Sequence, residues 1–125
     1  MSGGLIFVGT YAIPDGILEE FKVANRAMGD FVQANEPRIL SWHTYLNAAG
    51  DEATTIMTFP DSAALEQHLR VAADRVRQGT QMVQTKQVDL YGDASEAVIA
   101  ALQQLSAASG EWPVAVKPYF YGFSS

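Results

Sequence analysis

The sequence predicts a single α+β domain with the element order β-α-β-β-α-β, followed by one more helix and a C-terminal strand. Three observations lead to this prediction. A hairpin occupies residues 38–59, where β-branched and aromatic residues form two arms around a turn that contains Gly50 and Asp51. Amphipathic helical stretches precede and follow the hairpin, and a further strand lies beyond each of them. Helices that link strands in this order pack on one face of an antiparallel, ferredoxin-like sheet.

The first strand is predicted over residues 5–13, where nearly every position is apolar. Such a run is typical of a strand that is covered on both faces. Pro14 ends the strand, and Asp15 is placed to cap a helix over residues 17–35. Pro37 ends that helix, because the residue before a proline is pushed out of the helical region. The apolar stripe of the helix recurs at steps of three and four, at Ile17, Phe21, Ala24, Met28 and Phe31.

The second crossover helix is predicted over residues 63–78, with Gly79 as its end. A fourth strand follows over residues 80–91, and the polar residues within it favour a position at the edge of the sheet. The sequence Asp93-Ala-Ser-Glu96 has the pattern of a capping box and predicts the third helix. The aromatic tail over residues 112–123 contains two prolines, which cannot donate to a strand ladder. It is therefore predicted as an edge strand, paired either within the chain or with another subunit.

Composition excludes several classes of protein. The chain has 125 residues, a net charge of −6 and no cysteine, which fits one domain over residues 1–125. An acidic protein gains nothing from the release of phosphate counterions, so no nucleic-acid partner is expected. No apolar run is long enough for a membrane span, and no signal-peptide pattern is visible. These features and the lack of cysteine favour a cytoplasmic protein, and two distant histidines provide no metal-binding motif.

One face of the predicted sheet has no helix to cover it. The first strand is apolar on both sides, and the hairpin carries large residues on both sides. Exposing a second apolar face to water is unfavourable, so another surface must cover it. A second copy of the chain, packed sheet to sheet about a two-fold axis, satisfies this requirement with no further component. The sequence therefore predicts a homodimer.

Three short motifs accompany this element order. Gly9-Thr-Tyr11 lies on the first strand, Asn35-Glu-Pro37 precedes the second, and Phe59-Pro-Asp-Ser-Ala-Ala-Leu-Glu-Gln-His68 follows the third. In this combination the chain resembles the dimeric α+β barrel superfamily and, within it, the antibiotic biosynthesis monooxygenase-like group. The resemblance implies a homodimeric barrel with a pocket in each subunit between sheet and helices. It also implies activities such as cofactor-free oxygenation of aromatic polyketides, quinol oxygenation or haem degradation.

Two branches of the group use motifs that this chain lacks in part. The polyketide oxygenases carry an Asn at the end of the third strand and a Trp four residues later, where this chain reads Ile56-Met-Thr-Phe-Pro60. The haem-degrading branch implies an Asn on the first strand, a Trp, and a ligand His on the second helix. Only His68 corresponds to that set. Direct transfer of either activity is therefore not supported by these motifs.

Oxygenation without a cofactor requires an electron-rich phenol or anthrone, a base that deprotonates it, and hydrogen-bond donors that stabilise its anion in a dry pocket. The alternation of a strand places His43 and Tyr45 on one face and Trp42 on the other, so His43 and Trp42 cannot both line one pocket. The predicted site consists of proton-handling residues and pocket-wall residues. The first group is His43, Tyr45 and His68, and the second is Tyr11, Trp42 and Phe59.

Each candidate also has a purely structural interpretation. The commoner interpretation of His43 and Tyr45 is that they are hydrogen-bonded polar groups at the dimer interface, and that of His68 is a residue at the edge of the core. Two classes of function remain. The first is a cofactor-independent monooxygenase, without bound cofactor or metal, that acts on an aromatic, polyketide-like small molecule. The second is a non-catalytic homodimeric module that binds a small apolar ligand or none. Convergent His, Tyr and Trp side chains around an open cavity would favour the first.

Overall fold

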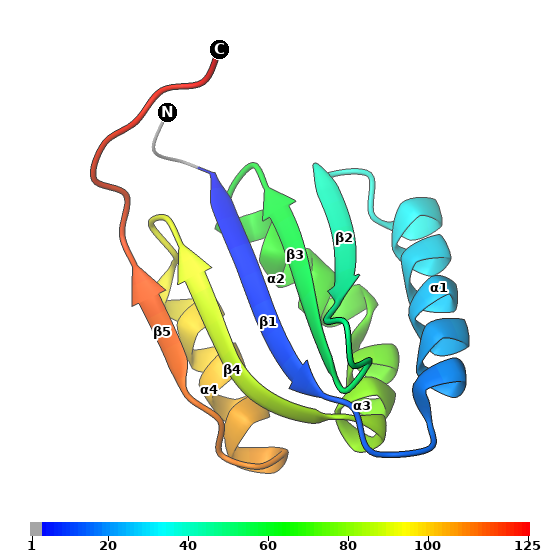
Figure 1. Ribbon diagram of the computed structural model, residues 1–125. Coiled ribbons are helices and arrows are strands. Elements are labelled where there is room, and N and C mark those ends of the chain that lie inside the picture. The colour runs from blue at the N-terminus through cyan, green and yellow to red at the C-terminus, as the bar shows by residue number, and fades with distance from the viewer. Residues whose placement is uncertain (1–3) are drawn as a thin grey trace.

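The computed structural model describes residues 4–125, and within this range a five-stranded sheet has all of its helices on one face (Figure 1). The elements differ from the predicted ones mainly at their ends. In chain order they are β1 (Leu5–Ala12), α1 (Leu18–Asn35), β2 (Ser41–Leu46), β3 (Glu52–Phe59), α2 (Ser62–Val71), α3 (Ala73–Met82), β4 (Gln84–Tyr91), α4 (Glu96–Ala108) and β5 (Val114–Lys117).

The strand order β2-β3-β1-β4-β5 confirms the ferredoxin-like fold with its appended helix and strand. The first four strands pair antiparallel, and β5 pairs parallel to β4 at the edge of the sheet. The predicted edge position of β4 is wrong, because β4 lies between β1 and β5. Its polar residues have another explanation. Thr10 faces Gln87 and Tyr11 faces Thr85, so a bulge leaves Lys86 outside the register, where its ammonium pairs with Glu52.

The predicted second crossover helix is two helices. The helix is interrupted at Ala72, whose φ of −97° and ψ of 12° depart from helical geometry between α2 and α3. Gly79 does not end a helix, since α3 continues to Met82, and β4 begins at Gln84 rather than at residue 80. The predicted cap at Asp15 is also wrong. The cap position of α1 is Ile17, with no side-chain hydrogen bond, whereas Ser95 caps α4 through the amide of Val98.

The core lies between the sheet and the helices. Alternate residues of β1, β3 and β4 point to this side and meet α2 and α4, as the period-two pattern of strands requires. No helix in the described part of the chain is long and apolar enough to cross a membrane. The fully buried residues of the main cluster are Leu5, Phe7, Met57, Phe59, Ala64, Leu65, Val88, Leu90, Val98, Leu102 and Trp112.

The opposite side of the sheet carries no helix (Figure 1), and we call it the open face. It is defined by side chains that pair across the strands and point away from the core, namely Ile6, Val8, His43, Tyr45, Ile56 and Tyr91. Ile6 is 42% exposed and Tyr45 is 57% exposed. Large apolar and aromatic side chains therefore face solvent on this side of the protomer.

Candidate functional site

A cavity of about 360 Å³ lies between the helical side of the sheet and the helices. Its inner wall is apolar and includes Phe7, Met57, Val88 and Leu102. The lining residues that remain exposed are Ala27 on α1 and Arg75, Gln78 and Gly79 on α3. The mouth of the cavity is therefore between α1 and α3. A concave, mostly apolar space with a few polar groups is typical of a small-molecule site.

A buried histidine–carboxylate pair lies at the cavity wall, and the histidine of this pair lines the cavity. His68 of α2 lines the cavity, and its Nδ1 lies 2.7 Å from Oε1 of Glu36, the residue directly after α1. His68 is 2% exposed and Glu36 is 3% exposed. In the imidazole tautomer that carries its proton on Nδ1, this N–H donates to the Glu36 carboxyl oxygen and Nε2 is the acceptor nitrogen. Among the described residues, Nε2 makes no hydrogen bond, which leaves it available to a ligand.

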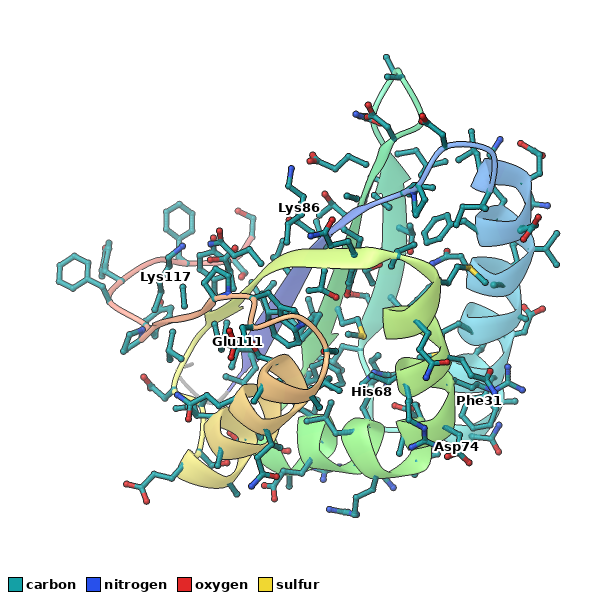
Figure 2. The ribbon with its side chains drawn as sticks, turned by 90° about the horizontal axis from the view of Figure 1, so that it is seen from below. Phe31, His68, Asp74, Lys86, Glu111 and Lys117 are labelled. Carbon is teal, nitrogen blue, oxygen red and sulfur yellow. The ribbon has the colours of Figure 1, made fainter. Side chains whose placement is uncertain are left out.

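Several contacts fix His68 in this position. Asp61 caps α2 by accepting a hydrogen bond of 2.9 Å from the amide of Ala64, and Arg38 bonds the same carboxyl. The Ala64 amide, with a further contribution from Arg38, holds the pKa of Asp61 below its usual value. The ring of Phe59 lies 5.9 Å from the His68 ring, centroid to centroid. Figure 2 shows His68 toward the middle of the molecule, whereas Phe31 and Asp74 lie near its edge.

Tyr11 supplies a second polar group to the cavity. Its ring folds back over Gly9, where an added Cβ would clash with the hydroxyl, so the sequence pairing of Gly9 with Tyr11 has a steric reason. Burial raises the pKa of the Tyr11 hydroxyl to about 12. The hydroxyl therefore stays protonated at neutral pH. Since no described residue bonds it, it is available as a hydrogen-bond donor to a ligand.

Trp42 forms part of the wall next to α1. It pairs with Met57 across β2 and β3 and points to the helical side of the sheet. Its ring lies directly against Gly29, because a Cβ added there would come 2.8 Å from the ring. Gly29 thus allows α1 to approach β2 closely with an indole between them.

The structure separates the predicted site residues into three groups. His68, Tyr11 and Trp42 line the cavity together. Phe59, predicted as pocket wall, is in the core behind His68 and is not part of the lining. His43 and Tyr45 lie on the open face, so they do not share a pocket with His68.

Sequence reasoning missed the partner of His68 and the mouth of the cavity. The sequence assigns Glu36 only to the turn that ends α1. The helix must stop before Pro37, and a side chain at that point can turn inward. No local pattern connects it to a histidine 32 residues away. Asn25, Arg75 and Gln78 also line the cavity, and each fits the polar side of a surface helix equally well.

Several solved structures share the fold of this chain. No protein-family model matches the sequence, and no curated protein matches it. MupZ from Pseudomonas fluorescens superposes with a TM-score of 0.78 at 16% identity, over 98% of this chain and 95% of that one. A variant of SnoaB, a cofactor-independent oxygenase from Streptomyces nogalater, gives a TM-score of 0.64 at 14% identity over 74% of this chain and 95% of its own.

A Caulobacter crescentus protein named as a candidate antibiotic biosynthesis monooxygenase gives a TM-score of 0.65 at 14% identity, over 75% of this chain and 92% of its own. These similarities confirm the predicted resemblance at the level of the fold, which is that of antibiotic biosynthesis monooxygenase-like proteins. Because the match to MupZ covers 98% of this chain, it includes α4 and β5 as well as the four-stranded part.

Proposed function

We propose that this chain is a cofactor-independent monooxygenase that acts on an aromatic, polyketide-like small molecule bound in the cavity. The observation that carries the proposal is the buried His68–Glu36 pair at the wall of a cavity that is otherwise largely apolar. Deprotonation of an apolar substrate requires a base in a space without water and a hydrogen-bond donor that stays protonated. The fold shared with SnoaB is in keeping with this activity.

The reaction is balanced for an anthrone. An anthrone and one dioxygen molecule give the corresponding quinone and one water. The substrate loses a proton to the enzyme base, and its carbanion supplies the electrons that reduce dioxygen. One oxygen atom stays on the ring carbon as the new carbonyl, and the other leaves as water with the two hydrogens that the ring carbon loses. The substrate is thus its own reductant.

Each cavity residue has a distinct role in this scheme. Nε2 of His68 accepts the proton from the substrate, and Glu36 holds the ring in the required tautomer and offsets the positive charge that forms. The Tyr11 hydroxyl donates a hydrogen bond to the oxygen of the enolate. Trp42 and the apolar wall exclude water, which strengthens both interactions. Glu36 is a positioning residue, since it acts through His68.

The open face supports the homodimer as part of this proposal. Ile6 and Tyr45 are large and exposed, and they lie on a sheet surface without helical cover. Packing against the same face of a second protomer would remove them from water and gain hydrophobic free energy. His43 and Tyr45 then become polar groups of the interface, and proton handling falls to His68 alone.

Oxygen uptake with dithranol, an anthrone, tests the proposed activity, with the rate in buffer alone subtracted. His68→Gln keeps an amide donor for Glu36 and removes the base, so we expect the enzymatic rate to fall about a hundredfold or more. His43→Gln on the open face is the matched control and should retain the rate. Full activity of His68→Gln, or no uptake above buffer with the wild-type protein, would contradict the proposal.

The second class of function, a non-catalytic module that binds a small apolar ligand, is favoured by one observation. Phenylalanine, methionine, leucine and valine side chains make up much of the cavity wall. Such a wall binds an apolar molecule without reacting with it. Dithranol that quenches tryptophan fluorescence without oxygen uptake would assign the chain to this class.

A further inference from the structure

We propose that the cavity selects ligands with an apolar body and a single carboxylate, and that Arg75 binds this carboxylate at the mouth. The inference rests on the proposed function for the use of the cavity as a substrate site, and it adds the substrate class. In this arrangement the apolar body extends inward past Trp42 toward His68, and the anionic group stays at the exposed end, between α1 and α3.

Arg75 is oriented by an aromatic ring rather than by a carboxylate. It lines the cavity from α3, and its guanidinium lies 4.4 Å from the centroid of the Phe31 ring on α1. A cation over a ring face is held in place, while the hydrogen-bond donors at the edge of its plane remain available. The neighbouring acidic residue, Asp74, pairs with Arg77 instead. Within residues 4–125, no ion pair involves Arg75.

The charge at the mouth differs from that of the whole chain. The protein has a net charge of −6, yet no aspartate or glutamate is among the described residues that line the cavity. Arg75 is the one side chain of this lining that is positive at every physiological pH. A cationic ligand would therefore meet an unfavourable charge at the entrance, and an anionic ligand a favourable one.

A carboxylate fits this site better than a phosphate does. A guanidinium binds a carboxylate with two parallel hydrogen bonds, and the two unit charges cancel. A phosphate monoester carries nearly two charges at neutral pH, and its third oxygen would need further cations. The other exposed polar side chain at the mouth is the neutral Gln78, and the partly buried Asn25 lies on the α1 side. Both amides can donate to an anion, and neither adds charge.

Binding of three probes with one ring system tests the proposal by tryptophan fluorescence, because Trp42 and Trp112 both line the cavity. The probes are 2-naphthoate, 2-naphthamide and 2-naphthyl phosphate. We expect the wild-type protein to bind naphthoate about tenfold more tightly than naphthamide, the effect of one charge-assisted contact. Arg75→Gln should remove this ratio and leave the affinity for naphthamide unchanged. Arg26→Gln, on the exposed side of α1 and outside the lining, is the matched control and should keep the ratio.

Four outcomes overturn the proposal. They are equal wild-type affinity for naphthoate and naphthamide, equal weakening of both by Arg75→Gln, tighter binding of the phosphate than of naphthoate, and no binding of naphthoate at millimolar concentration. The proposed activity fails separately, through the oxygen uptake of the wild-type protein and His68→Gln. Turnover of neutral dithranol without a preference for naphthoate would remove the carboxylate subsite and keep the oxygenase.

Discussion

The two faces of the sheet are built from the same strands and yet offer different chemistry. On the helical side, Trp42 and Tyr11 surround a cavity and His68 is paired with Glu36. On the open face, His43 forms no ion pair with any described residue, and Tyr45 is 57% exposed. On the helical side the buried histidine is paired, whereas the large apolar side chains of the open face have no cover within the described part of the chain. Alternate residues of these strands therefore point to two different surfaces, the cavity and the exposed face that we propose as the dimer interface.

The largest effect is expected on the free energy of unfolding when His68 is replaced, in comparison with the same replacement of His43. His68→Leu leaves the carboxylate of Glu36 buried with no partner, and its Oε2 already has none, so the free energy of unfolding should fall by about 3–5 kcal/mol. The double variant Glu36→Leu/His68→Leu removes the stranded charge and should recover much of the loss. His43→Leu on the open face should change the unfolding free energy by about 0.5 kcal/mol or less.

Urea unfolding at one protein concentration measures these differences. Equal losses for His68→Leu and His43→Leu would remove the distinction between the two faces. A double variant as unstable as His68→Leu would show that shape, rather than unpaired charge, sets the cost.

The next effect concerns association. Ile6→Lys places a charge on the open face of each protomer, so the dissociation constant of the homodimer should rise at least a hundredfold, or about 3 kcal/mol. Val23→Lys, at an exposed position of α1, is the control and should leave association unchanged. Sedimentation velocity over a range of concentrations measures both. A wild-type protein that is monomeric at every concentration would contradict the role given to this face.

A smaller effect is expected from Tyr11 at high pH. The folded-state pKa of Tyr11 is about 12, above its ordinary value of 10.0. The resulting contribution to stability is complete below pH 10 and is lost as the pH rises through 12, and it amounts to at most about 2–3 kcal/mol. The stability of Tyr11→Phe should fall less steeply with pH in this window than that of the wild-type protein, as measured by urea unfolding at several pH values. Identical curves for the two proteins would place Tyr11 in water.

The smallest effect compares two glycines near the cavity. A Cβ at Gly29 would come 2.8 Å from the Trp42 ring, so Gly29→Ala forces the indole to move and should cost about 1 kcal/mol after the gain in helix propensity. A Cβ at Gly79 meets nothing, so Gly79→Ala should stabilise the protein by up to about 1 kcal/mol. Thermal unfolding distinguishes the two. Stabilisation by Gly29→Ala would show that the indole is not in contact with α1.

The strand and helix order was predictable because it depends on local periodicity. The apolar run of β1, the alternation in the hairpin and the stripe of α1 each specify an element from its own residues. The break at Ala72 was not predictable, because alanine is the best helix former and its conformation here depends on burial in the tertiary structure. The bulge at Lys86 likewise depends on the register against β1, which no local pattern encodes.

The candidate site was predictable in part for a related reason. Tyr11, Trp42 and His68 stand out as aromatic or titratable residues on faces that a period-two or period-3.6 pattern turns inward. Glu36 and Arg75 do not stand out, since their roles follow from contacts with residues distant in sequence, His68 and Phe31. Phe59 points to the same side of its strand as the residues of the cavity wall, but it is packed in the core behind His68 and does not line the cavity.

The interruption at Ala72 separates α2 from α3, and the two helices contribute different parts of the candidate site. α2 carries His68, the base of the proposed reaction, and it buries Ala64, Leu65 and His68, so it is anchored in the core. α3 carries the entrance, and none of its described side chains is fully buried. Under the proposed function, substitutions in α3 would alter which molecules enter while His68 and Glu36 keep their geometry. A new ligand preference would then require changes in one short helix.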